Sequence, residues 1–386
     1  MPLQPLRIID ANLNRSSEGL RFLEDLARFL LNDATLSQQL RVMRHDLADK
    51  TKSLRVKLLS QRDSEHDVGH PHVPRQIKSG VDEGYLSPPL PSREINMKAK
   101  QSQQDLPNLI TANAKRIEES LRVLEELAKL PEISSMLDSA KFEQARFTFY
   151  EVEQNLISKI LRQDKIKQLT GLYVILDRQV LAGRNELDVA SQIIRGGAKV
   201  IQVRDKQSSK GELLPIAHKL RNLCAQSKVL FIVNDYLDLA LAVDADGLHI
   251  GQRDLPLPII RKELPIDKIT GCSVTTVAQA IKAQSQGADY IAVGSIFPTT
   301  TKKEATVVGI DRLKEVKQAV LAPLVAIGGI SQSNIPQVVA AGADSIAVIS
   351  AVLGQEDVKE VVQQLIAKMD LAKNPNLKIQ IPKFRM

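Results

Sequence analysis

The chain has 386 residues, 43% of them hydrophobic and 25% charged, which is typical of a soluble globular protein with two domains. It shows no signal peptide and no apolar run of about 20 residues, so we expect a cytoplasmic protein without a membrane partner. The net charge of +7 comes with only 3% aromatic residues, which favours anionic small molecules over nucleic acid as partners.

An internal repeat occupies the N-terminal half. Residues 7–28, RIIDANLNRSSEGLRFLEDLAR, match residues 108–129, NLITANAKRIEESLRVLEELAK, and both copies carry apolar residues at helical spacing. A second helix is expected after each copy, at residues 34–59 and 136–161. Residues 1–165 are therefore predicted to form an all-α domain, a bundle of about four helices.

A polar residue recurs at every third position of both copies. The two series are Asn12, Arg15, Glu18, Arg21 and Glu24, then Asn113, Arg116, Glu119, Arg122 and Glu125. Three residues advance a helix by about 300°, so this stripe winds round the helix and some of its charges must be partly buried. Two interpretations stay open. The charges form ion pairs that lock the two helices together, or Asn12, Arg15, Asn113 and Arg116 belong to a site for a phosphorylated ligand.

A segment without periodicity, residues 61–104, separates the copies and is rich in proline and glycine, so it is predicted to be a loop. His66, His70 and His72 lie in it, but their spacing matches no standard metal-binding pattern. A capping or flexible loop is therefore favoured over a metal site. Loops of this length are often functional, which keeps contact with substrate open.

Short apolar segments alternate with helical segments in residues 166–386. The expected strands are residues 172–176, 200–203, 230–233, 247–250, 269–273, 290–297, 324–327 and 345–349. Eight such units in succession predict a (β/α)₈ TIM barrel, so the fold class is α/β with an all-α helical-repeat domain in front.

Polar residues follow most of these strands, where a barrel carries its chemistry. The segment TTTKK after the sixth strand offers hydroxyl and ammonium donors for a phosphate, and Gly328, Gly329 and Ser350 follow the last two strands. Asp235 and Asp254 supply carboxylates that suit Mg²⁺ held jointly with substrate phosphates. These residues at the C-terminal rim of the predicted barrel therefore indicate small phosphorylated substrates.

The barrel half resembles thiamine-phosphate synthases. The motifs IQVRDK, VNDY, DGLHIGQRDLP, GCSVTT, GSIFPTTTKK and AIGGI carry the resemblance in this order. In that family, a hydroxymethylpyrimidine diphosphate loses pyrophosphate, and its methylene carbon is captured by the ring nitrogen of a thiazole phosphate. Ser295 departs from the family, which often has proline there, and Tyr236 stands where a charged or small residue is frequent.

The resemblance implies a role for each matching position. The pyrimidine diphosphate would contact Gln202, Arg204, Lys206, Asn234, Ser273 and Lys302. The thiazole phosphate would contact Thr299, Thr301, Gly328, Gly329, Ile349 and Ser350. Asp235 and Asp254 would hold one Mg²⁺. The alternatives for the barrel, a phosphosugar isomerase or an aldolase, leave this aspartate pair unexplained.

The N-terminal half resembles a small helical domain found fused to these synthases. The two copies of the repeat and the segment RDSEHDVG carry this resemblance. That family is associated with phosphorylating hydroxymethylpyrimidine phosphate to the diphosphate, which implies ATP as a further substrate. No Walker loop or kinase glycine loop is present. A non-catalytic dimerisation or regulatory module is the alternative, and a homo-oligomer remains open.

Overall fold

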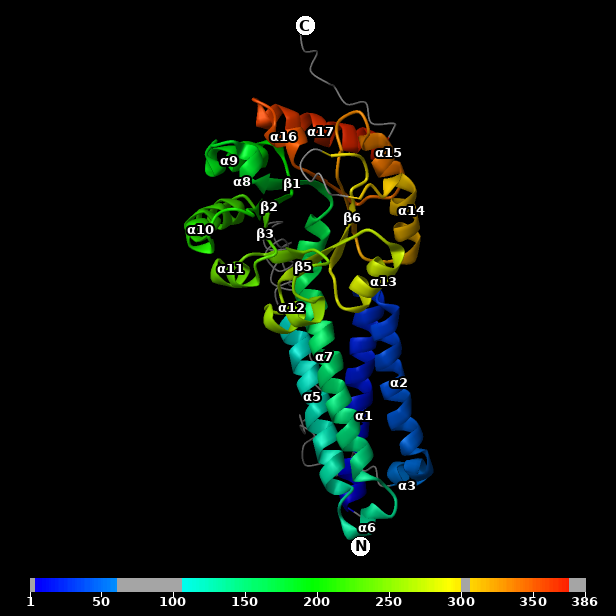
Figure 1. Ribbon diagram of the computed structural model, residues 1–386. Coiled ribbons are helices and arrows are strands. Elements are labelled where there is room, and N and C mark those ends of the chain that lie inside the picture. Colours follow the sequence, from blue (N-terminus) through cyan, green and yellow to red (C-terminus); the bar gives the residue numbers. More distant parts are fainter. Residues whose placement is uncertain (1–3, 61–105, 300–305, 375–386) are drawn as a thin grey trace, which may run out of the picture. The chain divides into compact units, whose positions relative to one another are not determined.

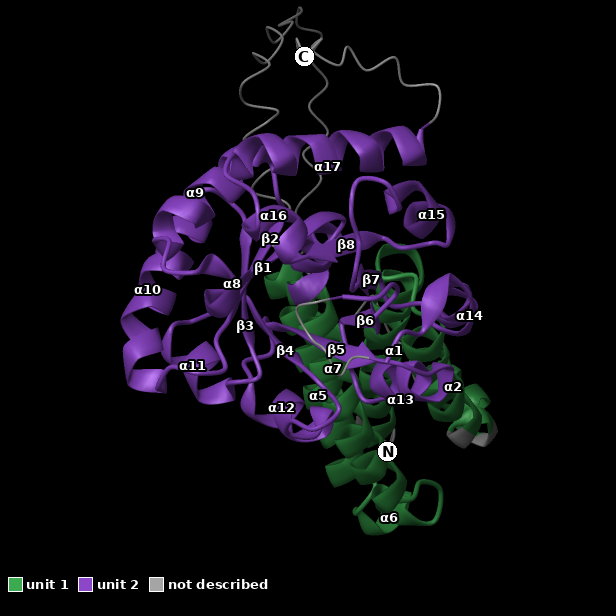
Figure 2. Ribbon diagram, turned by 45° about the horizontal axis from the view of Figure 1, so that its top comes forward, with its two compact units in different colours: residues 1–161 green, residues 162–386 purple. Residues whose placement is uncertain are grey.

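The computed structural model describes residues 4–60, 106–299 and 306–374. It divides into two compact units, Met1–Leu161 and Arg162–Met386, each with its own hydrophobic core (Figure 2). The predicted loop at residues 61–104, with His66, His70 and His72, lies outside the described residues, as do Thr301 and Lys302.

Unit 1 is entirely helical in its described part, as the repeat predicts. Its long helices are α1 (Gln4–Asp25), α2 (Ala34–Lys50), α5 (Leu106–Leu127) and α7 (Ser139–Gln168), whose last turns belong to unit 2. A π-helical turn (Leu26–Leu30), a 3₁₀ turn (Lys52–Leu54), α3 (Arg55–Ser60) and α6 (Pro131–Ser134) are the shorter segments.

The first helices of the two repeat copies, α1 and α5, pack against each other. Gly19 of α1 faces Ile117 of α5 so closely that a Cβ at position 19 would come 2.7 Å from Ile117 Cγ1. The apolar stripe of each helix is buried, with Leu20 and Leu23 on α1 and Leu121 on α5 fully shielded from solvent. The helical periodicity of the sequence thus becomes the core of the bundle.

The second helix of each copy differs from its predicted span. The stretch at residues 34–59 is interrupted at Thr51, whose Oγ1 donates back to Leu47 O at 3.0 Å and whose φ of −110° leaves the helical region. The stretch at residues 136–161 begins at Ser139 and continues to Gln168, because no proline or glycine interrupts it before Gly171.

Unit 2 contains the predicted barrel. Eight parallel strands pair in chain order and close through β1 with β8; Figure 2 labels all of them, and Figure 1 follows the chain through this unit by colour. The strands are β1 (Gly171–Asp177), β2 (Val200–Arg204), β3 (Leu230–Asn234), β4 (Gly247–Ile250), β5 (Ile269–Val274), β6 (Tyr290–Gly294), β7 (Leu324–Ile327) and β8 (Ser345–Val348). The helices are α8 (Arg178–Leu181), α9 (Glu186–Gly196), α10 (Lys210–Gln226), α11 (Leu237–Ala242), α12 (Leu257–Glu263), α13 (Val277–Ser285), α14 (Gly309–Ala319), α15 (Ile335–Ala340), α16 (Ser350–Leu353) and α17 (Val358–Lys373).

Side chains alternate between two buried faces of the strands. On β1, Leu172, Val174 and Leu176 pack against the outer helices, whereas Tyr173 and Ile175 point into the barrel. The interior is correspondingly filled by residues from several strands, so the barrel is a packed core and not a pore.

Strand β6 is shorter than the predicted span of residues 290–297. The strand ends at Gly294, and the next residue turns to the returning end of the loop: Ser295 N donates to Thr306 O at 3.3 Å and Val308 N donates to Ser295 O at 2.8 Å. Ile296 N and Phe297 N instead donate to Ile327 O at 2.9 Å and Gly328 O at 3.0 Å, so these two residues stay beside the end of β7.

No helix in residues 4–60, 106–299 and 306–374 combines the length and the apolar character needed to cross a membrane.

Two helical glycines of the barrel unit predict opposite effects of the same substitution. A Cβ on Gly196 of α9 would come 2.5 Å from Val362 Cγ1 of α17, whereas the nearest atom to a Cβ on Gly211 of α10 is 3.9 Å away. We expect Gly196→Ala to destabilise the unit by about 1 to 3 kcal/mol through overpacking. Gly211→Ala is the matched control and should stabilise by up to about 1 kcal/mol, because alanine favours the helix. Urea unfolding of both variants measures this, and equal shifts would contradict the packing of α9 on α17.

Candidate active site

The polar strand ends of the barrel converge on one cavity of about 480 Å³. This volume is in the range of small-molecule binding sites, and the cavity lies at the C-terminal ends of the strands, as in barrel enzymes generally. The residues predicted from sequence that line it are Gln202, Arg204, Lys206, Asn234, Asp235, Asp254, Ser273, Thr299, Gly328, Gly329, Ile349 and Ser350. Thr301 and Lys302 lie outside the described residues.

Two cations at the end of β2 are each held by a carboxylate. Arg204 Nη1 donates to Asp177 Oδ2 at the end of β1, and Asp177 is only 1% exposed. Lys206 Nζ donates to Asp235 Oδ2. Asp177 was missed by sequence reasoning, although it ends a buried strand as the other site residues do. It restrains the Arg204 guanidinium at the cavity wall.

The predicted metal ligands lie next to each other. Asp235 follows β3 directly and has a left-handed backbone conformation, with φ of +63°, which is rare for a residue with a side chain. Asp254 accepts a hydrogen bond from Gly251 N at 2.7 Å. Burial is the largest cause that raises the pKa of Asp254, and a hydrogen bond with Asp235 is the next. This is expected for two carboxyl groups so close together that two negative charges would repel each other.

This donor set fits a divalent cation completed by substrate oxygens. Within the described residues, no group of three or more His, Cys, Asp or Glu side chains forms a potential metal cluster. Two neighbouring carboxylates alone suit Mg²⁺, which typically binds one or two carboxylates together with water and substrate phosphates.

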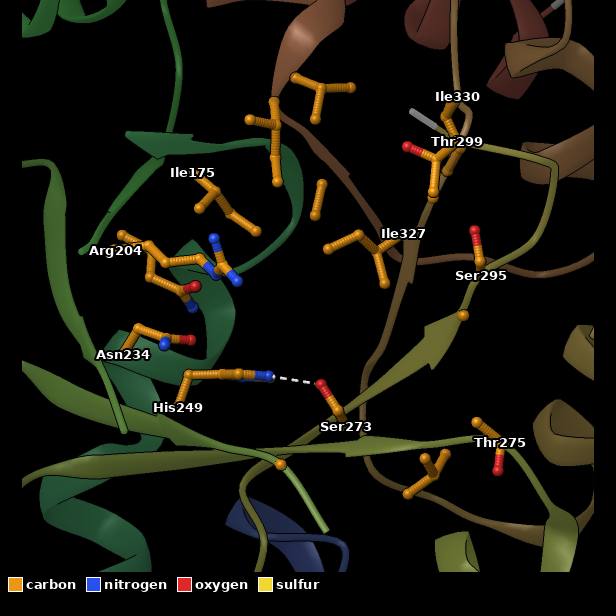
Figure 3. Close-up of a pocket in the computed structure, with 18 of the residues that line it drawn as sticks. Ile175, Arg204, Asn234, His249, Ser273, Thr275, Ser295, Thr299, Ile327 and Ile330 are labelled. Carbon is orange, nitrogen blue, oxygen red and sulfur yellow. Dashed lines mark hydrogen bonds between the residues drawn. The ribbon is translucent and has the colours of Figure 1, made fainter. Parts of the chain in front are cut away.

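The opposite wall is built from backbone turns. Gly328 and Gly329 follow β7 with φ of +100° and +63°, and a Cβ on either would clash with the segment after β6. Figure 3 shows Thr299 across the cavity from Arg204 and Asn234. Ser295, the departure from the family pattern, donates its hydroxyl to Phe297 O at 2.6 Å and so shapes this turn.

The floor of the cavity is a set of hydrogen-bonded side chains inside the barrel. His249 Nε2 lies 2.8 Å from Ser273 Oγ, and Figure 3 shows this contact beneath the cavity. Burial lowers the pKa of His249 to about 4, although Asp254 opposes the shift. The ring is therefore neutral at physiological pH. Sequence reasoning missed His249, and the only signal was a histidine within the otherwise apolar strand GLHI.

The polar stripe of unit 1 divides into buried and exposed residues. Glu24 and Glu125 are buried, and each accepts hydrogen bonds from the Nε and Nη2 atoms of one arginine on the next helix. These arginines are Arg44 on α2 and Arg146 on α7. The ion pairs therefore join the two helices within each copy, and they do not lock α1 to α5 as the first interpretation required.

The four candidate ligand-binding residues of the stripe have other environments. Asn12 and Asn113 donate to the carbonyl oxygens of Ile8 and Leu109, four residues earlier in the same helix, each at 2.8 Å. Arg15 and Arg116 are exposed, and among the described residues neither forms an ion pair. They thus occupy equivalent surface positions on α1 and α5.

Comparison with known proteins covers both halves of the chain. A family model described as thiamine monophosphate synthase matches residues 172–352, and the ThiD2 family matches residues 7–80 and 91–155. A thiamine-phosphate synthase of Thermosynechococcus vestitus is 34% identical over 368 residues, which cover 94% of this chain and 94% of that protein.

Two further relatives match only part of this chain. A thiamine-phosphate synthase of Clostridium tetani is 46% identical over 50% of this chain and 93% of its own length. A solved structure of thiamine phosphate pyrophosphorylase from Pyrococcus furiosus has a TM-score of 0.50 and 38% identity. It covers 54% of this chain and 98% of its own. Proteins of this type thus exist at about half the length of this chain.

The buried pairs of unit 1 predict a stability difference between two arginines that both contact Glu125. Arg146 is 12% exposed and Arg122 is 54% exposed. Arg146→Met should lower the stability of unit 1 by about 1.5 to 3 kcal/mol, because the buried Glu125 loses two charge-assisted hydrogen bonds and keeps only the contacts with Arg122 and Lys129. Arg122→Met should cost less than about 1 kcal/mol. Chemical denaturation followed by circular dichroism measures both.

The same pair predicts a pH dependence. Burial alone would raise the pKa of Glu125, but Arg146 and its other cationic neighbours lower it below the ordinary value of 4.5. A depressed folded-state pKa stabilises above the unfolded pKa, and this stability is lost as pH falls through the folded pKa. The deficit of Arg146→Met should therefore shrink as pH falls to about 4.5 and below, because Glu125 without Arg146 is protonated at a higher pH than in the wild type. A deficit that is independent of pH would show that lost packing, and not the ion pair, is responsible.

Proposed function

The chain belongs to the thiamine-phosphate synthase family, and from this premise we propose how its barrel cavity joins two phosphorylated substrates. Membership makes the protein a transferase of thiamine biosynthesis. The proposed reaction condenses 4-amino-2-methyl-5-(diphosphooxymethyl)pyrimidine with 4-methyl-5-(2-phosphooxyethyl)thiazole. Its products are thiamine phosphate and pyrophosphate.

The bond that breaks joins the methylene carbon of the pyrimidine to the diphosphate oxygen. The electron pair leaves with the diphosphate, and the thiazole nitrogen then supplies a pair to the same carbon. Negative charge develops on the leaving group, and Arg204 and Lys206 lie on the wall where they can stabilise it. Asp235 and Asp254 would hold Mg²⁺, which neutralises diphosphate charge when bound.

The other lining residues have binding and shielding roles in this proposal. Gln202, Asn234 and Ser273 are assigned to the pyrimidine diphosphate, together with Lys302. Thr299, Thr301, Gly328, Gly329, Ile349 and Ser350 are assigned to the thiazole phosphate. The cavity is also lined by Ile175, Ile327 and Ile330 (Figure 3). Their apolar side chains would keep water away from the positively charged methylene carbon that remains when the diphosphate leaves.

The observation that carries the proposal is the composition of this one cavity. The carboxylate pair Asp235 and Asp254 lies beside Arg204 and Lys206, opposite turns built from Gly328 and Gly329. A diphosphate with its metal ion accounts for two adjacent carboxylates beside two cations in this position.

For unit 1, we propose phosphorylation of hydroxymethylpyrimidine phosphate to the diphosphate, with ATP as donor. The ThiD2 match supports this proposal, and the exposed Arg15 and Arg116 are its candidate phosphate contacts. The second candidate is a non-catalytic dimerisation or regulatory module. It is favoured by the ion pairs Glu24–Arg44 and Glu125–Arg146, because the buried carboxylates of the stripe are engaged between helices and are not offered to a ligand.

The metal assignment predicts that Asp235→Asn lowers turnover by about 10²-fold or more, because one ligand is lost where charge develops. The measurement is thiamine phosphate formation against Mg²⁺ concentration. Asp238→Asn is the matched control, since this carboxylate is 62% exposed and pairs with Lys210 outside the main cavity. Near-normal activity of Asp235→Asn at limiting Mg²⁺ would reject the assignment.

The kinase assignment predicts that Arg116→Met lowers diphosphate formation from hydroxymethylpyrimidine phosphate and ATP by about 10²-fold. Its melting temperature should barely change, because the side chain is exposed. Lys115→Met, a neighbouring exposed cation on α5, is the control. The same variant given ready-made pyrimidine diphosphate should still make thiamine phosphate. Absence of kinase activity in the wild-type protein would leave unit 1 as a scaffold.

A further inference from the structure

A chain of side-chain hydrogen bonds crosses the barrel interior beneath the cavity. It starts at Gln202 on β2, whose Nε2 donates to Tyr173 Oη at 2.7 Å, and Tyr173 Oη lies 3.0 Å from Tyr290 Oη. Tyr290 Oη lies 3.0 Å from His249 Nδ1, and His249 Nε2 lies 2.8 Å from Ser273 Oγ on β5. The chain thus connects two residues of the cavity wall through three residues that lie deeper in the barrel.

The three connecting residues are almost completely buried. Tyr173 is 1% exposed, Tyr290 0% and His249 8%, and their neighbours in the interior are aliphatic, such as Ile232 and Val325. Aliphatic residues would fill this space without any need for hydrogen bonds, and each polar group here is costly unless it is paired. Stability of the core alone therefore gives no reason for this chain.

The chain has a direction, because each hydroxyl group has one proton. When Gln202 Nε2 donates to Tyr173, the proton of the Tyr173 hydroxyl is left for Tyr290, and the proton of the Tyr290 hydroxyl is left for His249 Nδ1. A neutral imidazole that accepts at Nδ1 carries its proton on Nε2, and it donates this proton to Ser273 Oγ. The Ser273 hydroxyl proton is then available to the cavity, and so is the Oε1 acceptor of Gln202.

We propose that Tyr173, Tyr290 and His249 are positioning residues that couple the hydrogen-bonding roles of Gln202 and Ser273. With the direction described, Ser273 is a donor toward the ligand and Gln202 is an acceptor. Rotating the Gln202 amide by half a turn reverses every bond, so the two ends exchange roles together. In the first arrangement the ligand meets the Ser273 proton together with the Gln202 Oε1, and in the reversed arrangement it meets the Ser273 oxygen together with the Gln202 amide N–H groups.

This pairing suits an aminopyrimidine, which has amine N–H donors and ring-nitrogen acceptors close together. The inference rests on the proposed assignment of Gln202 and Ser273 to the pyrimidine diphosphate. It adds a source of selectivity, because a ligand that accepts the Ser273 proton but offers no N–H group to Gln202 Oε1 leaves that buried oxygen unpaired.

Tyr290→Phe tests the proposal, because it removes the central hydroxyl and keeps the ring. The KM for the pyrimidine diphosphate should rise about tenfold, and the KM for the thiazole phosphate should change less than about twofold. In a Ser273→Ala background, Tyr290→Phe should add little, since the coupling of the two ends requires the Ser273 hydroxyl. Multiplying effects would show that Tyr290 acts independently and would overturn the proposal.

Ile232→Val is the matched control for a loss of packing in the same interior. It should lower the melting temperature without a selective change in either KM. If Tyr290→Phe does not fold, Tyr173→Phe cuts the same chain one bond nearer to Gln202 and must give the same selective rise. If neither variant shows a selective rise in the KM for the pyrimidine diphosphate, the proposal is overturned.

Nitrogen-15 NMR of histidine side chains tests the chain without substrate. In the wild-type protein, His249 should be the neutral Nε2–H tautomer, assigned by its loss in His249→Gln. In Tyr290→Phe, the Nδ1–H tautomer should gain population, because Nδ1 has lost its donor. An unchanged tautomer would overturn the coupling. If the tautomer changes but the protein makes no thiamine phosphate, the proposed function is rejected, whereas the coupling through the hydrogen-bonded side chains is supported.

Discussion

Closure of eight parallel strands into a barrel is the constraint on which the rest of unit 2 depends. It brings the carboxyl ends of all strands to one rim, so residues far apart in sequence, such as Arg204 and Thr299, line the same cavity. Closure also forces the strands to bury both faces, and the inward face is where Tyr173, His249 and Tyr290 meet. The cavity and the hydrogen-bond chain beneath it are thus two layers of one closed sheet.

The rim could be predicted from sequence and the floor could not, for a physical reason. Each strand appears in the sequence as a short apolar run followed by a polar residue, which identifies Asn234, Asp235 and Ser273 directly. When both faces are buried, apolar alternation does not distinguish inward from outward positions. Tyr173 and Tyr290 therefore resembled ordinary core aromatics until closure of the barrel brought their hydroxyl oxygens to 3.0 Å from each other.

In the N-terminal unit, sequence patterns also predict burial without predicting which residues come into contact. The three-residue stripe predicted that some charges must be buried, and Glu24 and Glu125 are. Their partners Arg44 and Arg146 lie on the second helices, outside the part of the repeat that the sequence match detects. Sequence periodicity describes one helix at a time, so which neighbour neutralises a buried charge becomes visible only when the helices are packed.

Gly271 has a consequence for how the barrel can change in evolution. It pairs in register with Tyr290, and a Cβ at position 271 would occupy the place of the tyrosine ring. A lineage that acquires a side chain at position 271 must therefore move the Tyr290 ring or replace it with a smaller side chain. Either change displaces the hydroxyl between Tyr173 and His249, so the two positions constrain each other. Drift at a residue that makes no polar contact of its own would thus alter which molecules the cavity accepts.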